Sequence, residues 1–105
     1  MSPGRPPAAR IDRAITAQPK SAEALLAKAQ LLRLKNDAVA ATAVLDELIR
    51  DQPGVTQARL DRASLLLAMG KNDQAKGDID TVLKATPGNV QGIYLRAVLS
   101  AQARN

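Results

Sequence analysis

The sequence has no cysteine and no histidine among its 105 residues. Without cysteine the chain can form neither a disulfide nor a thiolate metal site. Without histidine it also lacks the commonest metal ligand and the usual general base near neutral pH. The sequence therefore predicts no cofactor, no metal site and no enzymatic activity, and it leaves the cellular compartment open.

Aromatic residues are almost as scarce, since Tyr94 is the only one. Hydrophobic residues make up 46% of the chain and are nearly all Ala, Leu, Val and Ile, with no long alternation of apolar and polar positions. Strands draw on aromatic and β-branched residues, whereas Ala and Leu are strong helix formers. No apolar run approaches the roughly 20 residues of a membrane-spanning helix. We therefore predict an all-α protein that does not span a bilayer.

Three prolines reveal an internal repeat, because Pro19, Pro53 and Pro87 are spaced 34 residues apart. Small and apolar residues recur with the same period, in the columns Ala29, Ala63 and Ala97; Ala41 and Ala75; Leu31, Leu65 and Leu99; and Ile11, Leu45 and Ile79. Each unit contains two helical stretches, and the proline ends the second. We expect helices near residues 8–18, 22–35, 38–51, 56–69, 72–85 and 90–103.

Turn residues support these boundaries. Gly70 suits a left-handed C-cap, and Ser21 and Asn89 suit N-caps. The matching place in the middle unit is Val55, so we expect Thr56 to cap that helix instead. Gly77 lies inside a predicted helix, where glycine costs about 1 kcal/mol relative to alanine, and we take it as a sign of close backbone contact.

The period, the small-residue columns and the proline near the end of each unit resemble the tetratricopeptide repeat (TPR) family. The resemblance implies a right-handed α-solenoid of antiparallel helix hairpins over residues 8–105, after a flexible lead-in at residues 1–7. About two full repeats would carry a flanking helix at each end. Two columns depart from the family pattern: Leu25, Arg59 and Ile93, where a large aromatic is common, and Lys28, Arg62 and Arg96, where Leu is common.

The array is incomplete at both ends, which indicates a fragment of a larger protein. Ser100, which stands where earlier units have Leu, favours instead a solvent-facing last helix. The Ala-rich units with an Arg-Ala step look like bacterial TPR proteins, including large envelope lipoproteins.

In TPR arrays the first helix of each hairpin lines a concave groove, so the resemblance places a ligand face there. Its residues would be Leu26, Gln30, Arg33, Leu60, Ser64, Leu67, Tyr94 and Val98. The family's carboxylate clamp is absent, because Leu26, Gln30, Asp61 and Gln91 occupy its places. The row of Leu26, Leu60 and Tyr94 suits a helix or an extended segment, with Tyr94 as its anchor. Alternatively, neighbouring repeats or a capping helix of the full protein cover this row.

Two columns of opposite charge also follow the period: Lys28, Arg62 and Arg96 on first helices, and Asp12, Asp46 and Asp80 on second helices. We expect pairs between units, namely Asp12–Lys28, Asp46–Arg62 and Asp80–Arg96. The competing assignment pairs Lys28 with Asp46 and Arg62 with Asp80 within a unit. We prefer structural pairing to a phosphate-binding stripe, and we expect the clusters Asp46-Glu47 and Asp78/Asp80 to lie on solvated faces.

These observations predict a protein–protein interaction module or scaffold that binds a partner peptide or helix. One alternative is a structural spacer or self-association segment of a larger bacterial envelope or export protein, forming a weak homo-oligomer through its exposed terminal helices. Another is an RNA-binding helical repeat, since the net charge is +5. Its basic residues are dispersed, however, and only Tyr94 could stack on a base.

Overall fold

The computed structural model describes residues 21–104, which contain five α-helices and no strand. The helices are α2 (Ala22–Leu34), α3 (Ala38–Asp51), α4 (Thr56–Ala68), α5 (Asn72–Ala85) and α6 (Val90–Ala103). Two of them end one residue earlier than expected, α2 at Leu34 and α4 at Ala68. The helix expected near 8–18 and the lead-in at 1–7 lie outside the described residues.

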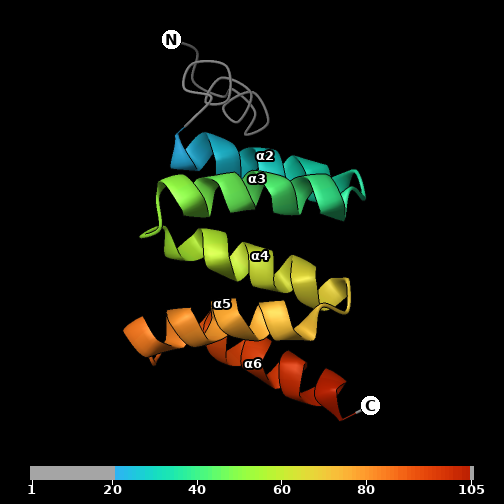
Figure 1. Ribbon diagram of the computed structural model, residues 1–105, viewed down its shortest axis with the longest axis vertical. Helices are drawn as coiled ribbons and strands as arrows, with labels where there is room; N and C mark the ends of the chain where they lie inside the picture. The colour runs from blue at the N-terminus through green and yellow to red at the C-terminus, as the bar shows by residue number, and fades with distance from the viewer. Residues whose placement is uncertain (1–20, 105) are drawn as a thin grey trace, which may run out of the picture.

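The helices form a stack of hairpins that runs from α2 to α6 (Figure 1). Helix α2 packs on α3 and α4 on α5, so each pair forms one hairpin. Contacts of α3 with α4 join the two hairpins, and α6 packs against both α5 and α4. The predicted all-α helical-repeat solenoid is therefore confirmed.

Short polar turns set where most helices begin and end. Asn36 and Gly70, 34 residues apart, both adopt positive φ, at 65° and 75°, which closes the first helix of each hairpin. Ser21, Asp37 and Asn89 accept hydrogen bonds from the backbone N–H three residues later. The expectation that Thr56 caps α4 is wrong. Thr56 is already the first helical residue, so Val55 occupies the N-cap, and the valine side chain has no acceptor for a capping hydrogen bond.

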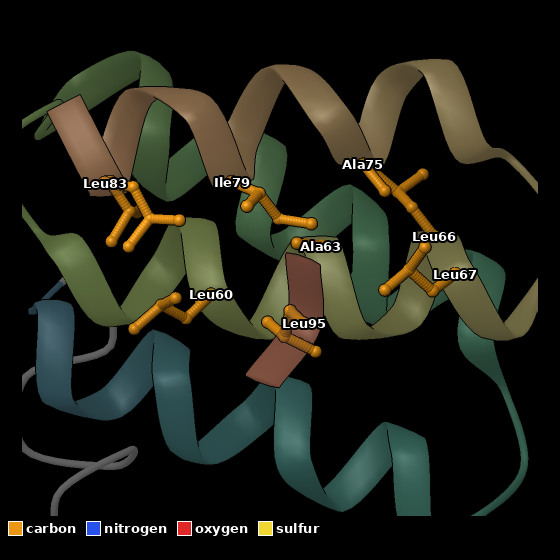
Figure 2. Packing of buried hydrophobic residues seen from close by; sticks show 9 residues of the cluster. Leu60, Ala63, Leu66, Leu67, Ala75, Ile79, Leu83 and Leu95 are labelled. Atoms are coloured by element: carbon orange, nitrogen blue, oxygen red, sulfur yellow. The ribbon is translucent and has the colours of Figure 1, made fainter. Parts of the chain in front are cut away.

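The core consists of two clusters that share α4. The first joins α2, α3 and α4 through Leu25, Ala29, Ala41, Leu45, Leu48, Ile49, Ala58 and Leu65. The second joins α4, α5 and α6 through Leu60, Ala63, Leu66, Leu67, Ala75, Ile79, Val82, Leu83 and Leu95 (Figure 2). Neighbouring Leu65 and Leu66 of α4 thus serve different clusters. The buried alanines let the helix backbones approach while leucine and isoleucine fill the space between them.

The two glycines inside helices have different surroundings. A Cβ added at Gly92 would lie 3.0 Å from Leu83 Cδ2, so α6 approaches α5 closely there. Gly92 shares its repeat column with the buried Ala24 and Ala58. A Cβ at Gly77 would meet nothing within 4 Å. The prediction of a close backbone contact at Gly77 is therefore wrong.

Candidate functional site

A line of polar contacts crosses the first helices of the repeats. Arg33 Nη2 of α2 donates to Ser64 Oγ of α4 at 3.2 Å. Gln57 Nε2 of α4 donates to Gln91 Oε1 of α6, also at 3.2 Å, and to Asp61 Oδ1 at 2.8 Å. We call the surface that carries these five residues the α2–α4–α6 face.

Asp61 is the buried acid of this face, with 6% of its surface exposed. Burial raises the pKa of its carboxyl above the ordinary 3.8, while the Gln57 hydrogen bond and the charge of Arg33 oppose that rise. The sequence analysis did not predict a hydrogen-bond partner for Asp61. The spacing of Gln57 and Asp61, four residues apart on one helix, was the signal that could have indicated it.

The residues expected to line a ligand groove differ in how deeply they are buried. Gln30, Arg33 and Tyr94 are exposed, and Tyr94 is 65% exposed. Leu26, Ser64 and Val98 are half-buried.

The prediction that Leu60 and Leu67 line the groove is wrong, because only 2% and 4% of their surfaces are exposed. Both belong to the cluster in which Leu95 of α6 packs towards α4 (Figure 2). They are core residues that a partner cannot reach while the fold is intact. The expected apolar row of Leu26, Leu60 and Tyr94 is therefore not an open surface.

Arg62 is the centre of an ion-pair cluster between the hairpins. Its Nη1 lies 3.0 Å from Asp46 Oδ1 of α3. Its Nη2 and Nε donate to the two carboxylate oxygens of Asp78 on α5, at 2.6 and 2.8 Å. The Asp78 hydrogen bonds, aided by Asp46 and opposed by burial, hold the pKa of Arg62 above its ordinary value.

The expectation that Asp78 lies on a solvated face is wrong, since only 4% of its surface is exposed. Asp46 and Asp78 come from different helices and converge on one guanidinium, whose planar fork can bind a carboxylate through two donors. Spacing along a single helix gave no sign of this arrangement.

Among the charge-column residues that the structure describes, Arg62 is the least exposed. Asp80 lies 2.7 Å from Lys76 Nζ and 3.8 Å from Arg96 Nη2. The structure thus brings together Asp46 with Arg62 and Asp80 with Arg96, each across a unit boundary. Arg62 meets Asp78 rather than Asp80. Lys28 is exposed, and its expected partner Asp12 lies outside the described residues.

A groove of about 670 Å³ lies between α3 and α5, with α4 forming its floor. Its lining includes Val39 and Ala43 from α3, Arg62 from α4, and Gly77 and Asp78 from α5. Sequence reasoning did not predict it. The sequence feature that could have indicated the groove is the repeat column of Ala43 and Gly77. Their small side chains leave space between α3 and α5.

Residues 21–104 offer no metal-binding cluster and no membrane-spanning helix. No cluster of acidic side chains in this part could hold a metal ion. None of its helices is both long and apolar enough to cross a membrane.

Stacked hairpins with small residues at their crossing points define a helical-repeat scaffold. The chain belongs to the tetratricopeptide repeat family, whose model matches residues 4–56 and 60–105. No curated protein and no solved structure matched the chain. TPR repeats generally mediate protein–protein interactions and form a non-catalytic scaffold.

Proposed function

We propose that this chain is a protein-interaction module that binds an extended segment of a partner protein on the α2–α4–α6 face. The observation that supports the proposal is the line of polar contacts over three helices beside an exposed aromatic ring. Tyr94 follows Gln91 by three residues on α6, so the two side chains lie on the same side of that helix. An anchor and a row of polar groups are thus side by side.

The chemistry of this face favours a peptide backbone as the ligand. The amides of Gln30 and Gln91 each carry a donor and an acceptor, as peptide groups do. Gln57 already donates to Asp61 and Gln91, so it would offer a peptide only its amide oxygen. Tyr94 adds a rigid amphipathic ring of the kind that dominates binding energies. Because Leu60 and Leu67 are buried, the face suits a mainly polar segment with one apolar side chain better than an apolar helix.

A selection from a displayed peptide library tests this proposal. The full chain would be used to select binders, and calorimetry would measure the affinity of each selected peptide for the chain and its variants. We expect Tyr94→Ala to weaken binding about tenfold or more, as a central aromatic anchor does. Gln57→Ala should weaken it less.

Val39→Ala is the matched control, because Val39 is 75% exposed but lies on α3 beside the other groove. This variant should bind the peptides as the unchanged chain does. If Val39→Ala weakened binding while Tyr94→Ala did not, the partner would bind between α3 and α5 and the proposal would be wrong.

A further inference from the structure

The last helix has one side that no described residue covers. In each complete hairpin, the first helix buries Leu25 and Ala29, or Ala63 and Leu66, under the second helix. The equivalent places on α6 are Ile93, Ala97 and Ser100, and all three are exposed. Ile93 is 52% exposed, and Val90 on the same side is 80% exposed. We call the surface formed by Val90, Ile93 and Ala97 the open α6 face.

The repeat itself shows what kind of element fits such a face. Helix α5 covers α4 with buried Ala75, Asp78, Ile79, Val82 and Leu83. Helix α3 covers α2 with Ala41, Leu45, Leu48 and Ile49, which occupy the same columns. In both cases a small residue is followed four, seven and eight residues later by larger apolar ones. The covering element is an amphipathic helix with this pattern.

Charge narrows the choice between the two patterns. Arg96 occupies the column of Arg62, and Asp80 lies near it much as Asp46 lies near Arg62. Arg62 has a second carboxylate, Asp78, three residues after the small Ala75. Within residues 21–104 Arg96 has no such second carboxylate, and its side chain is 56% exposed. The α5 pattern, with its acid, therefore complements α6 better than the α3 pattern, which has Val44 there.

We propose that the open α6 face binds a partner helix of the α5 type, antiparallel to α6. The partner helix places a small residue against Ala97 and a carboxylate on Arg96, and its larger apolar residues cover Ile93 and Val90. This surface is separate from the α2–α4–α6 face. Recognition here uses helix packing and one charge pair, so it selects partner helices by both shape and charge.

A peptide with the sequence of residues 71–87 serves as the probe. Its fluorescence anisotropy would be followed as the full chain is added. We expect saturable binding that Ile93→Asp weakens about tenfold or more, because a charge would be buried against apolar side chains. Val39→Asp, the same kind of change at a more exposed position on α3, should leave the affinity unchanged. Circular dichroism of both variants would check that they remain helical.

A double-mutant cycle tests the charge pair. Replacing the peptide's aspartate at position 78 by asparagine should weaken binding to the unchanged chain. The same replacement should have little further effect on the affinity for the Arg96→Gln variant, because the aspartate and Arg96 interact with each other. No binding of the peptide, or binding that Ile93→Asp leaves intact, would overturn the proposal. So would a dimer of the unchanged chain that Ile93→Asp dissociates in sedimentation, because the face would then be taken by a second copy.

Discussion

At the scale of single residues, the two helical glycines offer a matched pair of substitutions. We expect Gly77→Ala to raise the free energy of unfolding by about 0.5–1 kcal/mol, because the new methyl group meets open space and alanine favours the helix. Gly92→Ala should instead lower it by about 1–3 kcal/mol, because the methyl group would press on Leu83. Urea denaturation measures both, and effects of the same sign would contradict the packing described for α5 and α6.

Asp61 predicts a dependence of stability on pH. Its pKa is higher in the folded chain than the ordinary 3.8, so the folded state holds the proton more tightly than the unfolded state. The stability that this proton confers is present below pH 3.8 and is lost as the pH rises through the higher, folded pKa. At neutral pH the buried charge therefore costs stability.

Asp61→Asn should remove that cost, because an asparagine oxygen can still accept from Gln57 and carries no charge. We expect the variant to be more stable than the unchanged chain at about pH 7, and the difference to shrink at about pH 3. Urea denaturation of both proteins at the two pH values measures this difference. A variant that is less stable at neutral pH would show that the Arg33 charge outweighs the burial of Asp61.

At the scale of helices, Arg62 is the side chain whose loss should cost most among the ion pairs. Arg62→Met leaves Asp78 buried without its partner, and we expect a loss of about 3–5 kcal/mol in the free energy of unfolding. Asp46→Asn should cost at most about 1 kcal/mol, because the Asp46 side chain is half exposed. Denaturant unfolding compares the two variants.

The double variant Arg62→Met/Asp78→Leu provides the control for that experiment. Removing both charges leaves no unpaired buried ion, so most of the stability should return. Equal losses in Arg62→Met and Asp46→Asn would mean that burial of Asp78 is not what makes the pair important.

The helices and their pairing could be predicted because they follow from local, repeated features. Alanine at Ala29, Ala41, Ala63 and Ala75 marks the crossing points, and Gly70 marks a turn, whatever the rest of the chain does. Burial of Leu60 could not be read in the same way. It depends on how closely α6 approaches α4. The periodicity of a single helix gives no information about that distance.

The ion pairs show the same limit. The period predicted which columns carry charge, and Arg62 does lie beside Asp46. The second carboxylate bound to Arg62 comes from Asp78 rather than Asp80, and this depends on which face of α5 turns towards α4. The open side of α6 and the groove between α3 and α5 likewise arise from the arrangement of several helices.

At the scale of the whole molecule, the two core clusters predict that destabilisation stays local. Leu45 is fully buried in the cluster of α2, α3 and α4. We expect Leu45→Ala to cost about 2–5 kcal/mol and to speed amide hydrogen exchange in α2 and α3 much more than in α6. Exchange measured by mass spectrometry tests this, and uniform acceleration over all five helices would instead indicate a single cooperative unit.

Arg62 has a consequence for the geometry of longer arrays. It holds one carboxylate from α3 and another from α5, which belong to successive hairpins. The reach of one side chain thus helps to fix the angle at which each hairpin meets the next. In an array with many such joints, shortening or lengthening the cation at this position would bend or straighten the superhelix one joint at a time.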